Sequence, residues 1–271
     1  MICTLCPHHC NIKEGTLGLC SARRNLNGKI VCDNYGKLTA IALDPIEKKP
    51  LARFNPGSKI LSIGSYGCNM RCPFCQNHNI SMNTTMPTEY MEPSRLIEYA
   101  LSLKRYGNIG IAYTYNEPLI SYEYIMDCSK LAKENDLKNV LVTNGMICSE
   151  PLKALLPNID AMNIDLKGFT QEFYDFVFGD LETVKRSIEI SSSICHVEVS
   201  SLIIPDLNDS EGDMEKMSSW LGRIEKNIPF HISRFSPQYN MSEKAPTSIS
   251  QIYKLKEIAL KHLNYVYAGN C

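Results

Sequence analysis

The sequence of 271 residues lacks an excess of charge of either sign and a long hydrophobic run. Lysine and arginine number 28 against 29 aspartates and glutamates, so no broad basic field is available for nucleic acid or an anionic membrane. No run of about 18 apolar residues predicts a membrane-spanning helix. Because the first residues show no basic region followed by an apolar one, we expect a cytoplasmic protein whose partners include neither nucleic acid nor a membrane.

Cysteine, in contrast, is plentiful, with 12 residues in the chain. Disulfide frameworks usually occur in shorter chains with an export signal, whereas clustered thiols in the reducing cytosol more often bind metal. Seven of the cysteines form two clusters, Cys3, Cys6, Cys10 and Cys20 near the start and Cys68, Cys72 and Cys75 further on. The other five are scattered and are interpreted as small buried hydrophobic residues, namely Cys32, Cys128, Cys148, Cys195 and Cys271.

From about residue 60 onward, short apolar runs alternate with helical patterns, which is typical of a sheet of parallel strands. The predicted strands are 60–64, 109–115, 139–143, 159–166, 196–204, 230–235 and 265–267. The predicted helices are 93–105, 119–135, 181–193, 209–226 and 250–263. Such a pattern is compatible with a barrel, whole or partial, and with an open doubly wound sheet.

Residues 1–58 differ from the rest because they contain a cysteine cluster and no long helical pattern. We predict a hairpin over 29–43, with its bend near Asn34-Tyr35-Gly36. The chain is therefore divided into a cysteine-rich N-terminal extension, 1–58, and a strand-helix part, 59–271, which together form one compact unit.

The spacing Cys68-x3-Cys72-x2-Cys75 lets a single loop wrap a cubane iron–sulfur cluster. Three thiolate ligands leave one iron of such a cluster free to bind another molecule. The loop follows the predicted strand 60–64, at the strand end where parallel α/β folds place their chemistry. The alternative is a structural zinc site, for which His78 could supply the fourth ligand.

This cysteine spacing, with aromatic Phe74 before the last cysteine, resembles the hallmark of the radical S-adenosylmethionine (SAM) superfamily. The resemblance implies a partial (β/α)6 TIM-like barrel and a [4Fe–4S] cluster held by Cys68, Cys72 and Cys75, with SAM on the free iron. In that superfamily, reductive cleavage of SAM gives methionine and a 5'-deoxyadenosyl radical, which abstracts hydrogen from a substrate. The protein's task is then to bind, orient and shield the cofactors.

The resemblance extends over essentially the whole chain to the radical SAM component of the AmmeMemoRadiSam system, a relative of the pyruvate formate-lyase activating enzymes. The matching stretches are 6–10, 44–51, 67–77, 113–118, 142–145, 163–168, 203–209 and 265–270. In activating enzymes, a Gly-Gly-Glu-type turn binds the amino group of SAM. The matching turn here is Tyr115-Asn116-Glu117, in which the glycines are replaced and Glu117 keeps the acid. The alternative role of Glu117 is to stabilise a helix N-terminus.

Asp165 and Lys167 match an Asp-x-Lys motif of the activating enzymes, and alternate residues of a strand share a face. Lys167 is expected to hold the carboxylate of SAM while Asp165 binds a cation or a ribose hydroxyl, although a surface ion pair is the simpler alternative. Thr143 and Asn144, at the preceding strand end, are expected to line the same pocket. His231 matches a histidine that contacts the nucleoside part of SAM, and a buried histidine in the core is its alternative.

Cys3, Cys6, Cys10 and Cys20 offer four thiolates in a short span, enough to close a tetrahedral site. The donor set suits zinc or an auxiliary iron–sulfur cluster, and His8 or His9 could replace one thiolate. We expect a bound metal, because a short segment poor in helix needs a covalent or metal staple to stay folded.

Three functions are compatible with these features. The first is a radical SAM enzyme that acts on a protein or small molecule within the AmmeMemoRadiSam system. The second is an activating enzyme that takes hydrogen from a glycine of another protein. The third is a non-catalytic metal-binding or electron-transfer protein. Both enzyme functions require an external low-potential electron donor such as a flavodoxin or ferredoxin.

Overall fold

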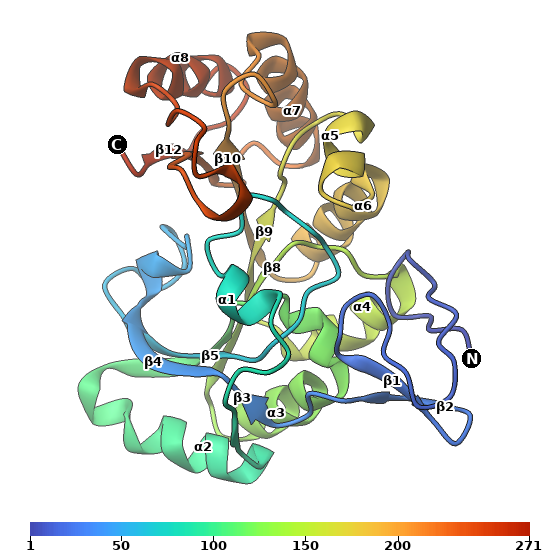
Figure 1. Ribbon diagram of the computed structural model, residues 1–271. Coiled ribbons are helices and arrows are strands. Elements are labelled where there is room, and N and C mark those ends of the chain that lie inside the picture. The colour runs from blue at the N-terminus through green and yellow to red at the C-terminus, as the bar shows by residue number, and fades with distance from the viewer.

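The computed structural model describes residues 1–271 and is built around one eight-stranded sheet (Figure 1). The strand order is β12-β11-β10-β9-β8-β7-β5-β4, and all neighbours are parallel except β4, which runs antiparallel to β5 at one edge. The strands of this sheet are β4 (Ala40–Pro45), β5 (Lys59–Gly64), β7 (Asn108–Tyr113), β8 (Lys138–Thr143), β9 (Ala161–Asp165), β10 (His196–Ile203), β11 (Phe230–Arg234) and β12 (Val266–Gly269). All seven strands predicted from the sequence are present, so the expected α/β fold with a parallel sheet is confirmed.

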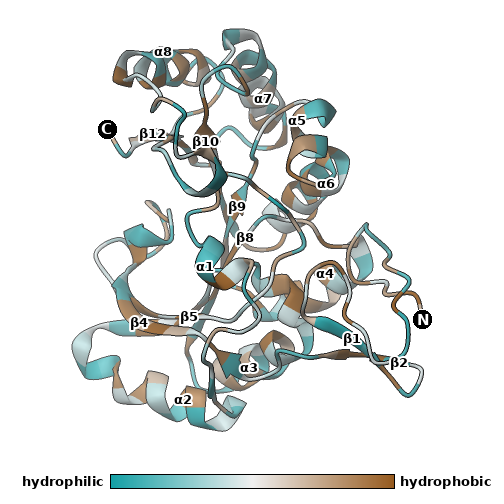
Figure 2. Ribbon diagram, in the orientation of Figure 1, coloured by the Kyte–Doolittle hydropathy of each residue, from teal (hydrophilic) through white to brown (hydrophobic).

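Helices connect the parallel strands and pack with them around a cluster of 52 buried hydrophobic residues. The five predicted helices correspond to α2 (Pro93–Ser102), α3 (Tyr122–Glu134), α6 (Leu181–Ser192), α7 (Glu211–Ile224) and α8 (Ile249–Ala259). Shorter helices are α1 (His78–Ser81), α4 (Ser149–Leu155) and α5 (Gln171–Phe176), with 3-10 turns η1 (Ile46–Lys48), η2 (Lys104–Tyr106), η3 (Pro118–Ser121), η4 (Leu156–Asn158) and η5 (Tyr239–Met241). Figure 2 shows helices with one polar and one apolar side, as expected of helices that cover a sheet. None of the helices is both long and apolar enough to cross a membrane.

The predicted hairpin over 29–43 is wrong. The hairpin is instead formed by β1 (Arg23–Leu26) and β2 (Lys29–Cys32), and it turns at Asn27-Gly28. Both turn residues have positive φ, 52° and 70°, which is the conformation that favours Asn-Gly in a two-residue hairpin loop. The next strand, β3 (Lys37–Leu38), pairs with β6 (Glu89–Tyr90), while β4 joins the central sheet.

The segment that follows β4 crosses the sheet on its inner side. Leu51 packs in one small cluster with residues of β5, β7, β8 and β9. Further along, the backbone N–H groups of Ala52 and Arg53 donate to the buried carboxylate of Glu198 on β10, at 2.9 and 2.7 Å. The segment therefore covers the inner face of the sheet below the carboxyl ends of the strands. The division at 58/59 stays a prediction, and strands on both sides of it belong to one sheet.

Candidate active site

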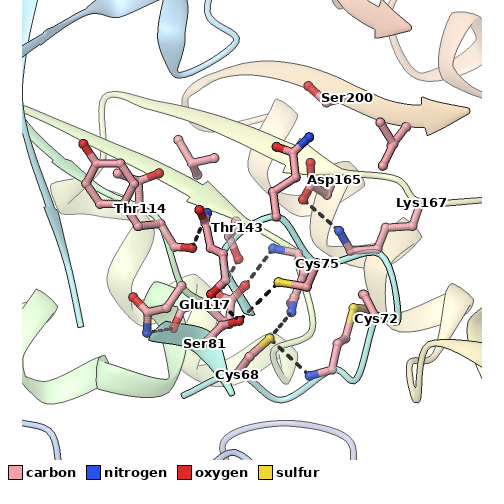
Figure 3. A pocket seen from close by; sticks show the side chains of 18 of the residues that line it. Cys68, Cys72, Cys75, Ser81, Thr114, Glu117, Thr143, Asp165, Lys167 and Ser200 are labelled. Atoms are coloured by element: carbon pink, nitrogen blue, oxygen red, sulfur yellow. Dashed lines mark hydrogen bonds and ion pairs between the residues drawn. The ribbon is translucent and has the colours of Figure 1, made fainter. Parts of the chain in front are cut away.

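The carboxyl ends of the central strands surround a cavity of about 540 Å³ (Figure 3). Ends of parallel strands meet at one edge of a sheet, so residues far apart in the sequence converge there. Ten of the predicted site positions line the cavity, and they are Cys68, Cys72, Phe74, Cys75, Asn116, Glu117, Thr143, Asn144, Asp165 and Lys167. His231 does not line it.

The three cysteines of the loop after β5 face this cavity as free thiols. Burial raises the pKa of Cys72 to about 11 and that of Cys68 above its usual range, so both hold their protons until a metal displaces them. His78 does not complete a zinc site: its ring stacks on Tyr239 with centroids 4.4 Å apart, and its Nδ1 lies 3.2 Å from the carbonyl oxygen of Cys75. Three thiols on an open cavity fit a cluster with one free iron.

The cysteine loop is held by contacts on both sides. Asn69 donates to the carbonyl oxygen of Met146 at 2.7 Å and accepts from Asn144 at 2.9 Å. The guanidinium of Arg71 donates to the carbonyl oxygen of Cys68 at 2.7 Å and also to that of Leu19 in the N-terminal segment. The loop is therefore positioned by the residues that follow β8 on one side and by the N-terminal segment on the other.

Two side chains of the predicted motif, Asn116 and Glu117, hold the turn after β7 in place. The amide of Asn116 donates to the carbonyl oxygens of Tyr66 and Gly67, both at 3.1 Å, and accepts from Ser65 N–H at 3.0 Å. It therefore ties the turn to the stretch that precedes Cys68. Tyr115, at the position of a family glycine, has φ +70°, a left-handed conformation that is rare for an aromatic residue.

Glu117 ties the same turn to the end of β8. Its Oε1 accepts from Leu119 N–H at 3.0 Å and from the hydroxyl of Thr143 at 2.6 Å, while its Oε2 accepts from Asn144 N–H at 2.8 Å. Burial raises the pKa of Glu117 to about 7, although these hydrogen bonds oppose the shift. A carboxylate has roughly four acceptor sites, so one remains for an ammonium group. Glu117 therefore caps the helix start, as in the alternative role, and keeps one acceptor site for the predicted contact with the amino group of SAM.

Asp165 and Lys167 point the same way, as expected for alternate residues at a strand end, and form an ion pair of 2.9 Å (Figure 3). Burial alone would lower the pKa of Lys167, but attraction to Asp165 outweighs it and holds the pKa above its usual value. Asp165 is the more exposed partner, with 41% of its side chain accessible against 17% for Lys167. A fixed cation therefore stands at the wall of the cavity.

His231 lies deeper in the fold than the prediction required. Its Nε2 bonds to Glu198 at 2.6 Å, and its ring stacks on Tyr267 with centroids 5.2 Å apart. This is the buried-histidine alternative of the sequence analysis. Ser233, two residues further on the same face of β11, lines the cavity instead.

Cys3, Cys6, Cys10 and Cys20 line a second, small cavity together with His8, and none forms a disulfide. The Nε2 of His8 lies 2.7 Å from the carbonyl oxygen of Asn69, so this ring faces the cysteine loop. No three His, Cys, Asp or Glu side chains stand close enough to hold a single metal ion, at these cysteines or at Cys68, Cys72 and Cys75. Of the five scattered cysteines, Cys128 is buried as expected, whereas Cys271 is exposed beyond the end of β12.

Residues 62–221 match the family model described as the Radical SAM superfamily. The chain belongs to the radical SAM superfamily. It is therefore an enzyme of the class that uses a [4Fe–4S] cluster and SAM. Membership also identifies an enzyme rather than a non-catalytic metal-binding or electron-transfer protein.

Curated relatives place this radical SAM enzyme near the activating enzymes. An uncharacterized protein of Methanocaldococcus jannaschii is 40% identical, over 99% of this chain and 80% of its own length. A putative glycyl-radical enzyme activating enzyme of the same organism is 24% identical, over 76% of this chain and 79% of its own. The pyruvate formate-lyase-activating enzyme of Clostridium pasteurianum is 23% identical, over 71% and 80% of the two chains.

Solved structures agree on the fold. QueE from Escherichia coli superposes with a TM-score of 0.53 at 13% identity, over 87% of this chain and 93% of its own. SuiB from Streptococcus suis bound to SAM gives a TM-score of 0.57 at 11% identity, over 78% and 52% of the two chains. At such identities these structures support the radical SAM fold alone.

Several residues at the cavity of this radical SAM enzyme were not predicted from the sequence. They are Glu47, Lys48 and Pro50 from the segment after β4, Ser200 on β10, Ser233 on β11 and Asn270 just after β12. The strand-end rule could have found Asn270, which follows the predicted strand 265–267, whereas Ser200 and Ser233 lie inside their predicted strands. Nothing in the sequence pattern indicated that the segment after β4 reaches the cavity.

Proposed function

We propose that this enzyme cleaves SAM reductively and uses the 5'-deoxyadenosyl radical to abstract hydrogen from a substrate of the AmmeMemoRadiSam system. The observation that carries the proposal is that three free thiols share one cavity with the turn 114–117 and the pair Asp165–Lys167. Cluster, sulfonium and methionine groups can therefore be held side by side.

In this proposal, Cys68, Cys72 and Cys75 would hold the [4Fe–4S] cluster. When bound, the cluster supplies the electron that splits SAM into methionine and the 5'-deoxyadenosyl radical. Lys167 would pair with the carboxylate of SAM, because it is a fixed cation on the cavity wall. Glu117 would accept a hydrogen bond from the amino group through its remaining acceptor site. Thr143 and Asn144 keep the Glu117 carboxylate in place.

The electron would come from an external low-potential donor such as a flavodoxin or ferredoxin. The proposal is tested by electron paramagnetic resonance of the anaerobically reconstituted, reduced protein. A [4Fe–4S] signal that changes when SAM is added is the expected result, because SAM would occupy the free iron. A signal that is unchanged by saturating SAM would contradict the assignment of this cavity.

A glycyl-radical activating function is the second candidate, because two of the relatives above are named activating enzymes. The partner would then be a second polypeptide. Incubation with a candidate partner, the electron donor and SAM should give a stable organic radical on that polypeptide in the activating case. Loss of hydrogen from a small molecule, without such a radical, favours the first function.

We further propose that the four N-terminal cysteines bind one metal centre, zinc or an auxiliary iron–sulfur cluster, with a structural role. The support is that Cys3, Cys6, Cys10 and Cys20 line one small cavity as free thiols, and binding of the metal would draw them closer together. Four protein ligands leave a metal no open position for substrate. Metal analysis should find either one zinc or about four irons per chain beyond the catalytic cluster.

A further inference from the structure

The strained residue of the SAM turn, Tyr115, is tied to a buried ion pair outside the cavity. Its hydroxyl donates to Asp44 Oδ2 at 2.7 Å. The same oxygen accepts from Lys49 Nζ at 2.8 Å, and that ammonium lies 4.6 Å from the centroid of the Tyr115 ring. Neither Asp44 nor Lys49 lines the cavity, whereas Tyr115 does, so Tyr115 connects the pair to the cavity wall. Lys48, another lining residue, lies 3.5 Å from the other oxygen of Asp44.

The local sequence explains how this pair forms. Asp44 lies on β4, opposite Ile60 of β5, and the 3-10 turn η1 reverses the chain so that Lys49 returns to it. Both side chains are nearly inaccessible, with 12% and 4% exposed. A buried ion pair is weak support for stability, because an apolar pair of similar volume is often as stable or more so. Its position suggests a role in orientation.

That role follows from the backbone of Tyr115. A φ of +70° is unfavourable for any residue with a Cβ and is maintained only where the surroundings fix it. The hydroxyl and the ring of Tyr115 are both held by the pair. The neighbouring side chains Asn116 and Glu117 then receive their direction from this residue.

We infer that the Asp44–Lys49 pair is a latch that holds Tyr115 in its left-handed conformation and thereby sets the SAM-binding turn. Asp44, Lys49 and Tyr115 are positioning residues in this account. The inference rests on the proposed binding of SAM at the turn 114–117. It predicts that SAM affinity depends on whether residue 115 is kept at positive φ, either by the hydroxyl bond to Asp44 or by the conformational freedom of glycine.

The experiment measures SAM binding to anaerobically reconstituted protein by isothermal titration calorimetry. Tyr115→Phe removes the hydroxyl and should weaken binding about tenfold, and Tyr115→Val should weaken it further because β-branched residues resist positive φ. Tyr115→Gly should bind SAM within about twofold of the parent, because glycine adopts this conformation freely. Tyr35→Phe is the matched control, since it removes a hydroxyl that also bonds to an aspartate at 2.7 Å but forms no hydrogen bond with the turn 114–117.

A second set of variants tests the pair itself. Asp44→Leu/Lys49→Met replaces the ion pair with apolar groups, so the core stays filled and the protein is expected to fold. It should weaken SAM binding about as much as Tyr115→Phe, and adding Tyr115→Gly should restore the affinity. Thermal unfolding of each variant monitors the fold.

The outcomes distinguish failure of the latch from failure of the proposed function. A parent protein that fails to bind SAM overturns the proposed function and the latch with it. A parent that binds SAM, with Tyr115→Phe and Asp44→Leu/Lys49→Met binding equally well, overturns the latch alone. Failure of Tyr115→Gly to restore affinity in the apolar-pair background also overturns it, because a side chain in direct contact with SAM would behave in that way.

Discussion

Lys167 stands at the cavity wall as a cation whose position is set by one partner. Its ammonium lies 2.9 Å from Asp165, and the alternation of side chains along β9 and the following residues brings both to the same face. Such a charge is ready to receive a carboxylate without moving. The ion pair therefore places charged groups on the side of the cavity that is formed by β9.

Replacement of Lys167 should reduce SAM affinity without loss of the cluster. We expect Lys167→Ala to weaken binding by about 1.5–3 kcal/mol, the usual cost of losing one charged hydrogen bond, while the iron content and cluster absorbance stay at the parent level. The control is Lys138→Ala, which breaks an ion pair of similar length, 2.8 Å to Asp160, near the start of β8. Equal affinities in the parent and Lys167→Ala would show that SAM is not held here.

Glu198 should make the protein sensitive to acid. Burial alone would raise the pKa of Glu198, but hydrogen bonds from His196, His231 and the N–H groups of Ala52 and Arg53 outweigh it and lower the pKa to about 2. The stabilisation is complete above the unfolded value of 4.5 and is lost as pH falls toward 2. Urea unfolding of Glu198→Gln should show a smaller fall in the free energy of unfolding over this range than the parent. Parallel pH dependences in both proteins would contradict this role.

Single residues were predicted from the sequence where spacing constrains them. Cys68, Cys72 and Cys75 follow one strand at fixed intervals, and Asp165 and Lys167 share a face because strand side chains alternate. His231 could not be placed in the same way. Its depth along β11 depends on the register with β10, which brings Ser200 opposite it and Glu198 within hydrogen-bond reach, and no local pattern encodes that register.

At the scale of elements, the cysteine loop depends on a glycine that lets it approach the N-terminal segment. Gly67 has φ +90°, and a Cβ at this position would lie 2.4 Å from the carbonyl oxygen of Cys20. Conformation and space both exclude a side chain. The loop and the N-terminal segment are therefore in backbone contact just before Cys68.

Gly67→Ala should separate these two elements. We expect a loss of about 2 kcal/mol or more in the free energy of unfolding and a lower iron content after reconstitution. Gly57→Ala is the matched control, since Gly57 has φ +81° but a Cβ there meets nothing within 4 Å. Gly57→Ala therefore measures the free-energy cost of alanine at positive φ without a steric clash. Equal costs and equal iron in the two variants would show that the approach to Cys20 is unimportant.

The strands and helices were predictable because their periodicity is local, and the positions of Pro93 and Ser210 at helix starts agree with the helix signals in the sequence. The position of the hairpin was not predictable in this way. Asn34-Tyr35-Gly36 resembles a bend between strands, yet β3 and β4 find partners in β6 and β5, which are distant in sequence. Pairing at that distance is decided by packing, which a local pattern does not contain.

At the scale of the whole molecule, the N-terminal segment braces the catalytic loop. His8 contacts the carbonyl oxygen of Asn69, Leu19 accepts from Arg71, and Cys20 lies against Gly67. In Figure 1 this segment lies beside α4, away from α7 and α8. Its metal centre would thus stabilise the surface on which the loop rests.

Removal of two N-terminal thiols tests this structural role. We expect a Cys6→Ser/Cys10→Ser variant to lose the N-terminal metal and to unfold at lower temperature, because metal binding is coupled to folding. Cys128→Ser is a control for the loss of a buried thiol outside both clusters. A variant that melts like the parent and binds SAM, yet cleaves little of it, would contradict the structural role and favour an auxiliary cluster that serves electron transfer.

The measurement that tests the central claim most directly is the release of 5'-deoxyadenosine. Anaerobically reconstituted protein with dithionite and SAM should form it, and a Cys72→Ala variant should not, because two remaining thiolates are too few to hold a cluster with one free iron. Liquid chromatography with mass spectrometry quantifies the product in both samples. Formation at the same rate by parent and Cys72→Ala, or by neither, would contradict the account.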